Sequence, residues 1–222
     1  MSNPHKANPN TQVKSKERVQ KHGEVFTPEW VVNDMLDLLP DEVWHPEKTF
    51  LEPACGEGAF LVEIYKRKLQ KINSEIQKEW EWQAAIATSS MYGIELLEDN
   101  VKQCRKNLKL IFKTLYQRHY PDTQNREVIN AIHFLINRNI IKGNALTCRK
   151  CTLVCGNKCT SCEKILFSEW TPCASFHLKR KDYTYEGIIL SQMDASNLFK
   201  DEDGFVNEYK QVNYKRIRYA KN

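Results

Sequence analysis

The sequence lacks any long apolar run. No hydrophobic segment approaches the roughly 18 residues that a membrane-spanning helix needs, and the N-terminal stretch MSNPHKANPNTQVKSKERVQKHGE lacks the apolar core of a signal peptide. We therefore expect no membrane partner and a cytoplasmic location. Because that compartment is reducing, the eight cysteines should be thiols or metal ligands and not disulfides.

The sequence also lacks internal repeats and a strong charge bias. Its 222 residues are 41% hydrophobic and 27% charged, close to the average of globular proteins, and its net charge is +5. This length is sufficient for one sizeable core with an appended module, and the small positive charge is a mild argument for an acidic partner. Residues 1–23 are polar and show no periodicity, so we expect a disordered basic arm there.

Short apolar segments alternate with segments of helical periodicity in the middle of the chain. The expected helices begin with one from Pro28 to Leu39 and continue at 59–82, 99–120 and 125–137. The expected strands lie at 48–52, 90–96 and 139–146. This alternation predicts an α/β fold with a parallel sheet over residues 24–147, and ligands of such sheets bind at the carboxyl ends of the strands.

Glycine is scarce, yet two of the eight glycines flank Glu57 directly after the first expected strand, in TFLEPACGEGAFL. Glycine lets the backbone approach a ligand closely, and the N–H groups that open the next helix favour an anion. Glu95 ends the neighbouring expected strand, where a carboxylate can accept both hydrogen bonds of a ribose diol. These features predict a nucleoside pocket. The alternatives are a simple tight turn or a nicotinamide dinucleotide site, although the loop lacks the full G-x-G-x-x-G.

Four segments resemble motifs of the S-adenosylmethionine-dependent DNA methyltransferases, especially the adenine-N6 enzymes of restriction–modification systems. FLEPACGEGAFL is similar to their first motif, GEVFTP to the motif upstream of it, YGIEL to the ribose-binding motif and IIKGNAL to the motif that reads the cofactor's adenine. The resemblance covers about residues 22–146. It implies a class I methyltransferase-like, Rossmann-type parallel sheet that is incomplete in this chain, with S-adenosylmethionine as cofactor and DNA as partner.

The resemblance also implies cofactor-binding roles for individual residues. Three would border the methionine end of the cofactor: Phe26, Thr27 and Pro28. Four would form the turn that passes under it: Glu52, Ala54, Gly56 and Gly58. Glu95 would hold the ribose hydroxyls, and Leu96 would pack against the adenine. Asn144 stands where the family usually has an aspartate that accepts a hydrogen bond from the adenine amino group, a bond that an amide oxygen accepts more weakly.

The sequence contains no Pro-Pro pair, and this absence concerns catalysis. In the family, Asn or Asp followed by Pro-Pro and Tyr or Phe ends the fourth strand, accepts the hydrogen bonds of the adenine amine and stacks on the flipped base. The nearest candidate by position, YEGIILSQMD at 185–194, is either an ordinary strand or helix start or a degenerate remnant of that loop. The catalytic residues therefore stay unassigned, and a partner methyltransferase subunit would have to supply the motif and the recognition domain.

Five of the eight cysteines lie in CRKCTLVCGNKCTSC, and two C-x-x-C pairs within it have the spacing of a four-sulfur zinc site. The predicted ligands are Cys148, Cys151, Cys159 and Cys162. Cys155 or Cys173 could replace one of them, and an iron–sulfur cluster or free, redox-active thiols are the alternatives. We predict a structural zinc in an insert at 148–173. A C-terminal segment, 174–222, would then complete the sheet and end in a basic tail.

Two functions of different classes fit these observations. The first is an S-adenosylmethionine-dependent adenine-N6 DNA methyltransferase that needs a partner chain for the catalytic loop and for target recognition. The second is a catalytically inactive module, derived from such an enzyme, that binds S-adenosylmethionine and zinc and acts in nucleic-acid or partner binding. A methyltransferase for another substrate is a weaker third reading. The missing Pro-Pro motif is the feature that distinguishes them.

Overall fold

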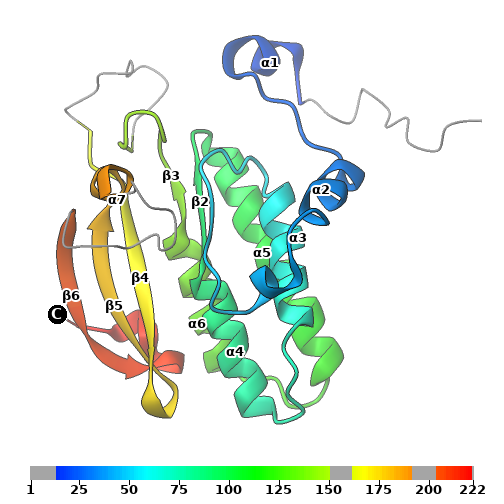
Figure 1. The fold of residues 1–222 in the computed structure, drawn as a ribbon, viewed down its shortest axis with the longest axis vertical. Helices are drawn as coiled ribbons and strands as arrows, with labels where there is room; N and C mark the ends of the chain where they lie inside the picture. Colours follow the sequence, from blue (N-terminus) through cyan, green and yellow to red (C-terminus); the bar gives the residue numbers. More distant parts are fainter. Residues whose placement is uncertain (1–13, 151–161, 192–203, 222) are drawn as a thin grey trace, which may run out of the picture.

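The computed structural model describes residues 14–150, 162–191 and 204–221. Its strands form two sheets of three (Figure 1). The first sheet is parallel, in the order β1-β2-β3, and consists of β1 (Phe50–Glu52), β2 (Met91–Glu95) and β3 (Ile140–Lys142). The second is antiparallel, in the order β4-β5-β6, and consists of β4 (Leu166–Cys173), β5 (His177–Thr184) and β6 (Phe205–Asn213).

Helices precede and connect the strands. The α-helices are α1 (Lys16–His22), α2 (Glu29–Leu36), α3 (Ala59–Gln70), α4 (Gln77–Ser89), α5 (Glu98–His119), α6 (Arg126–Asn139) and α7 (Tyr185–Ser191). Short 3-10 helices are η2 (Asp41–Trp44), η3 (Ala174–Phe176) and η4 (Tyr214–Tyr219). None of the helices in the described ranges has the length and apolar character that crossing a bilayer requires. The expected α/β fold with a parallel sheet is confirmed over the first half of the chain.

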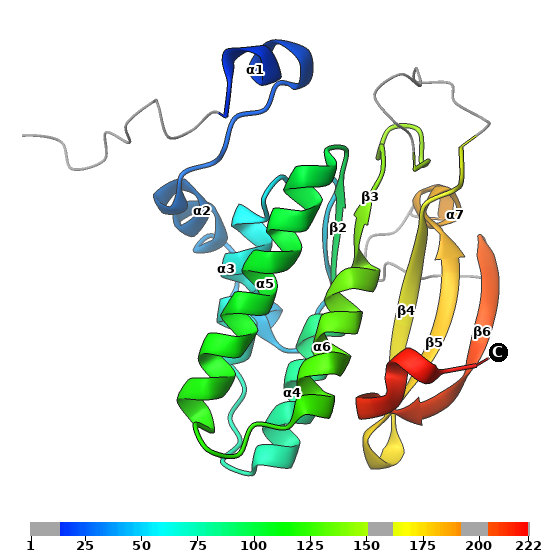
Figure 2. The same cartoon turned by 180° about the vertical axis from the view of Figure 1, so that it is seen from behind.

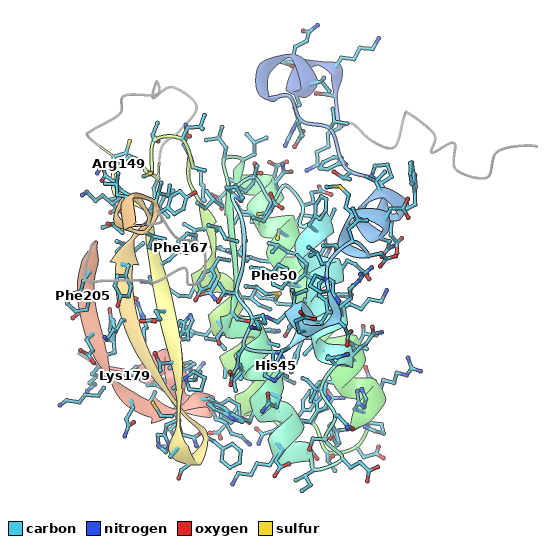
Figure 3. All side chains as sticks on the ribbon, in the orientation of Figure 1. His45, Phe50, Arg149, Phe167, Lys179 and Phe205 are labelled. Atoms are coloured by element: carbon cyan, nitrogen blue, oxygen red, sulfur yellow. The ribbon has the colours of Figure 1, made fainter. Side chains whose placement is uncertain are left out.

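In both views the antiparallel sheet lies on one side of β2 and β3, and helices α3 and α5 lie on the other (Figures 1 and 2). Helices α4 and α6 also contact β4. On the helical side, α5 buries one stripe at helical spacing: Val101, Cys104, Leu108 and Phe112. On the other side, the Tyr92 hydroxyl donates a 2.8 Å hydrogen bond to the backbone carbonyl of Ser168 in β4. Phe167 lies between the two sheets (Figure 3), with its ring centroid 5.2 Å from that of Tyr92. All of β2 is therefore buried, as a central strand of a covered parallel sheet should be.

The register of the parallel sheet brings its functional loops together. Glu52 pairs with Gly93 across β1 and β2, and Glu95 pairs with Lys142 across β2 and β3. Because the strands are parallel, their carboxyl ends lie along one edge. The loops that begin at residues 53, 96 and 143 therefore start side by side.

The expected helix over 59–82 is wrong, because the structure has α3 and α4 with a break at residues 71–76. Apolar residues keep helical spacing through the break, which is why the periodicity suggested one helix. Ser74 interrupts it, since its hydroxyl accepts a 3.3 Å hydrogen bond from the backbone N–H of Ile76. Short polar side chains of this kind compete with helical hydrogen bonding.

The C-terminal segment also differs from expectation. In the described residues, β5 and β6 pair with β4 and do not extend the parallel sheet. Residues 185–191 of the candidate fourth strand form helix α7. The basic tail is packed and not extended, since Tyr214 and Ile217 of η4 are buried. At the other end of the chain, part of the expected arm is ordered as α1, while residues 1–13 lie outside the described ranges.

Candidate functional site

A cavity of ≈ 530 Å³ lies at the carboxyl ends of β1, β2 and β3. Four segments line it: the segment between α1 and α2, the loop after β1, the loop and helix start after β2, and the loop after β3. The lining residues are Gly23, Glu24, Val25, Phe26, Pro53, Ala54, Gly56, Glu95, Leu96, Leu97, Asn100, Gly143, Asn144, Ala145 and Leu146. The parallel sheet thus collects residues from across the first 146 positions at one site.

The loop after β1 depends on its two glycines for its path. Gly56 has φ +53° and Gly58 has φ +90°, both in the left-handed region that favours glycine. A Cβ atom on Gly58 would lie 2.6 Å from the Sγ atom of Cys104 on α5, whereas one on Gly56 would meet no atom within 4 Å. Gly58 therefore allows the loop to lie directly on α5, and Gly56 provides the turn above it.

Glu95 links the end of β2 to the glycine loop. Its side chain is 9% exposed. One carboxylate oxygen accepts a 3.0 Å hydrogen bond from the backbone N–H of Gly56, and the other accepts a 2.8 Å bond from the N–H of Leu97. An ionised carboxylate has about four lone-pair sites, so two such bonds leave it able to accept hydrogen bonds from ligand hydroxyl groups.

Asn144 forms a side-chain turn at the opposite wall of the cavity. Its side-chain amide oxygen accepts a 2.9 Å hydrogen bond from the backbone N–H of Leu146, and its backbone N–H donates a 2.8 Å bond to the carbonyl of Arg149. The side chain is therefore fixed by a local turn. The Leu146 side chain that this turn presents at the cavity is 83% exposed, so a bound ligand would cover apolar surface there.

Glu24 and Asn100 also line the cavity, and sequence reasoning missed both. The Asn100 amide donates a 2.5 Å hydrogen bond to Glu24, and Arg18 adds a bidentate contact to the same carboxylate. Burial would raise the pKa of Glu24, but the bonds from Arg18 and Asn100 outweigh burial and lower it. Glu24 stands inside the GEVFTP segment, which was a usable signal. Nothing in the sequence indicated Asn100.

The structure brings most of the predicted cofactor-binding residues to this cavity: Phe26, Ala54, Gly56, Glu95, Leu96 and Asn144. Thr27 and Gly58 line a neighbouring hollow of ≈ 440 Å³ that shares Phe26. Pro28 caps the start of α2. Glu52 ends β1, and burial raises the pKa of its carboxyl group although the Ala54 N–H bonds to it.

Two of the four predicted zinc ligands, Cys151 and Cys159, lie outside the described residues, as does Cys155. In the parts of the chain that are described, no three metal-binding side chains of His, Cys, Asp or Glu cluster together. The backbone on either side of the cysteine segment is paired, however. The Lys150 N–H donates a 2.8 Å bond to the carbonyl of Glu163, and the Ile165 N–H donates a 3.0 Å bond to the carbonyl of Cys148. The zinc site stays a prediction.

Comparison with known proteins indicates the family to which the chain belongs. A family model described as the DNA-methyltransferase domain of MmeI matches residues 36–167, which is more than half of the chain. Over 53 residues the chain is 40% identical to Type II methyltransferase M.VspI of Vibrio sp. (strain 343). That segment is 24% of this chain and 12% of the relative, so the relative is about twice as long. No solved structure matches.

Proposed function

Because the chain belongs to the family of the MmeI DNA-methyltransferase domain, we propose that its cavity binds S-adenosylmethionine and that the protein acts in DNA methylation of the restriction–modification type. The observation that carries the proposal is the position of Glu95. This buried carboxylate ends the central strand, holds the glycine loop and faces a cavity whose size is typical of small-molecule sites.

Each side of the cavity would contact a different part of the cofactor. Glu95 would accept hydrogen bonds from the ribose hydroxyls, and Leu96 would pack on the adenine. The remaining lone pair of the Asn144 amide oxygen would accept a hydrogen bond from the adenine amino group. Phe26 and the loop around Gly56 would border the methionine end. When bound there, S-adenosylmethionine supplies an electrophilic methyl group, and this chain's residues orient it.

We propose an adenine amino group as the methyl acceptor, on the strength of the four motifs that resemble adenine-N6 enzymes. The groups that would accept the hydrogen bonds of that amine are not identified in this chain, because the sequence has no Pro-Pro motif. Transfer would form an N–C bond and break the S–C bond of the cofactor, and the amine would lose a proton. The residue that holds the amine during this step is therefore not assigned within this chain.

A second polypeptide that carries an Asn/Asp-Pro-Pro-Tyr/Phe motif is our proposed source of that residue. β1 is the end strand of the parallel sheet, and no strand pairs with its outer edge within the described ranges. A strand added there in parallel would end beside the cavity. Helix α2, which packs on α3, and the turn after it expose apolar side chains, with Met35 52% and Leu38 85% exposed.

A structural zinc in the cysteine segment is also part of the proposal. The antiparallel pairing of residues 148–150 with residues 163–165 supports it, because this pairing holds the first and last of the predicted ligands at the base of one loop. Metal analysis of purified protein should find zinc, and the double variant Cys148→Ser/Cys159→Ser should lose it. Equal zinc content in both proteins would contradict the zinc site.

The cofactor proposal is tested by calorimetric titration of the purified chain with S-adenosylmethionine. We expect micromolar binding by the native protein and a loss of at least tenfold in affinity for Glu95→Gln, which loses the charge that strengthens the hydrogen bonds to the ribose. Glu98→Gln is the matched control, since Glu98 lies on the same loop–helix junction but does not line the cavity. A folded sample that binds no cofactor would overturn the proposal.

The proposal of a partner is tested by transfer of a labelled methyl group to duplex DNA. The isolated chain should bind cofactor without transferring it, and transfer by the chain alone would contradict the need for a partner. Co-expression with a neighbouring reading frame that encodes the missing motif should yield N6-methyladenine. If methylation appears as N4-methylcytosine instead, the proposed acceptor is wrong. If no preparation transfers a methyl group, the inactive cofactor-binding module becomes the better description.

A further inference from the structure

Two basic residues of the N-terminal segment contact acidic residues around the cavity. They are Lys14, which precedes the N-cap of α1, and Arg18, which lies within α1, and together they are called the basic clamp here. Ser15 fixes where the helix begins, because its hydroxyl accepts a 3.2 Å bond from the Arg18 N–H. Gly23 fixes where it ends, with φ +63° and an N–H that donates 2.9 Å to the Val19 carbonyl.

The basic clamp contacts three of the segments that form or adjoin the cavity. Lys14 reaches Glu57 of the glycine loop at 2.6 Å and Asp99 at the start of α5 at 3.1 Å. Arg18 reaches Asp99 at 2.7 Å and the Glu24 carboxylate at 2.7 Å. The contacts to Glu57 and Asp99 join residues far apart in sequence, so the clamp connects the start of the chain with two loops of the parallel sheet.

The clamp also contacts the cavity wall between α1 and α2. Residues 23–28 have no helix or strand structure of their own, yet Gly23 to Phe26 line the cavity. Glu24 anchors the wall through Arg18 and Asn100. Lys14 also lies over the Phe26 ring, 5.6 Å from its centroid, a favourable cation–π geometry.

The charges make the clamp more than an incidental surface contact. Two cations here serve three carboxylates, and the Glu24 side chain is 8% exposed. The hydrogen bond from Arg18 lowers the pKa of Asp99, and the bond to Glu24 raises the pKa of Arg18. Removal of Arg18 would leave the shielded Glu24 carboxylate without its bidentate partner, an arrangement that disfavours the closed wall.

We propose that Lys14 and Arg18 are positioning residues for the cofactor. Neither lines the cavity. They act by holding the Gly23–Phe26 wall against the glycine loop and α5, so that the site is formed before the ligand arrives and little affinity is lost in ordering it. This inference rests on the proposed binding of S-adenosylmethionine, and it concerns how that site is kept in shape.

The test compares full-length variants by calorimetric titration with S-adenosylmethionine. Arg18→Ala and Lys14→Ala/Arg18→Ala should raise the Kd by about tenfold or more. Arg18→Lys should lie between these and the native protein, because it keeps the charge and loses the bidentate contact. Lys16→Ala is the matched control, since Lys16 is an exposed cation of the same helix, and its Kd should not change. Circular dichroism would verify that each variant is folded.

A second readout needs no cofactor. Hydrogen exchange of residues 23–28 in the free protein should be faster in the Arg18→Ala variant than in the Lys16→Ala variant, whereas a merely local role of Arg18 in α1 would change exchange in α1 alone. Native protein that binds no S-adenosylmethionine would contradict the proposed function. Native protein that binds it, with equal affinity and equal exchange in the clamp and control variants, would overturn the clamp and leave the proposed function standing.

Discussion

The two sheets of this protein place their polar side chains differently. The strands of the parallel sheet are three to five residues long, and their polar groups gather at the carboxyl ends beside an open cavity. The strands of the antiparallel sheet are eight or nine residues long, and two of them, β4 and β5, bury polar side chains in their interior. Ser168, Arg180 and Asp182 are all buried there.

This difference indicates that the parallel sheet carries the ligand-binding site and that the antiparallel sheet has a structural role. In the antiparallel sheet the buried polar groups bond to one another: Asp182 accepts 2.7 Å bonds from Ser168 and Arg138 and a 2.8 Å bond from Arg180. A network of this kind is satisfied internally and holds the sheet against α6. At the cavity, by contrast, the side chains of Glu95 and Asn144 accept hydrogen bonds from nearby backbone N–H groups. Each of them keeps acceptor capacity for a ligand.

The largest expected effect comes from breaking the network of the antiparallel sheet. Asp182→Ala leaves Arg180 and Arg138 without their shared carboxylate, and we expect a loss of about 3 to 5 kcal/mol in the free energy of unfolding. Urea denaturation would measure it. Glu208→Ala, which removes a surface ion pair with Lys179, is the control and should have little measurable effect. If the folded Asp182→Ala protein lost cofactor binding, the division between binding and support would be wrong.

A substitution in the glycine loop after β1 should lower both the free energy of unfolding and the affinity for S-adenosylmethionine. Gly58→Ala forces a Cβ atom against Cys104 and keeps φ at +90°, so we expect a loss of about 2 to 4 kcal/mol and much weaker S-adenosylmethionine binding. Gly56→Ala has open space around the added methyl group and should cost only about 1 kcal/mol. Partial recovery in Gly58→Ala/Cys104→Ala, measured by urea denaturation, would identify the contact as the cause.

The edge of the parallel sheet opposite the cavity provides a pH test. Burial lowers the pKa of Lys68 to about 7, and its amine donates hydrogen bonds to the Lys48 carbonyl and the Ser90 hydroxyl. Between pH 7 and 10 the unfolded chain binds this proton and the folded protein does not, so stability should rise with pH by roughly 1.4 kcal/mol per unit at most. Lys68→Met should flatten the dependence and leave the cofactor Kd unchanged. An equally steep dependence in the variant would exclude Lys68 as its source.

The smallest expected effect is a gain. Asn144→Asp restores the carboxylate that the resembling enzymes carry, and a charged acceptor strengthens hydrogen bonds to the cofactor's adenine and to the Leu146 N–H. We expect S-adenosylmethionine to bind about 3- to 10-fold more tightly by titration calorimetry. Weaker binding would show that Asn144 does not face the adenine.

The sequence predicted the parallel sheet well because its signals are local. Helix α5 was expected at 99–120 and is found at 98–119, and its apolar spacing is uninterrupted. The glycine loop and Glu95 each follow a short apolar strand, so their position at the strand ends followed from the pattern. Asn100 could not be found in this way, because its bond to Glu24 joins residues 76 positions apart.

The sequence pattern did not predict the antiparallel sheet, because the charged side chains of its buried network interrupt the apolar pattern of a strand. Alternate positions of β5 point inward, and Leu178, Arg180 and Asp182 are buried there. Two of these three inward side chains are charged. Hydropathy therefore does not alternate along HLKRKDYT, and the usual strand signal is absent. The ion network replaces the apolar pattern, and nothing in the local sequence shows that these charges are paired.

Because the contact between the glycine loop and α5 buries two thiols, opening of the loop could be detected by thiol labelling. Cys55 belongs to this loop, Cys104 lies beneath it, and both thiols are buried. A thiol reagent reaches them when the loop lifts from the helix, so their rate of labelling measures how often the floor of the cavity opens. Ligand that holds the loop down would slow that rate, which gives the protein a built-in reporter of occupancy that requires no turnover.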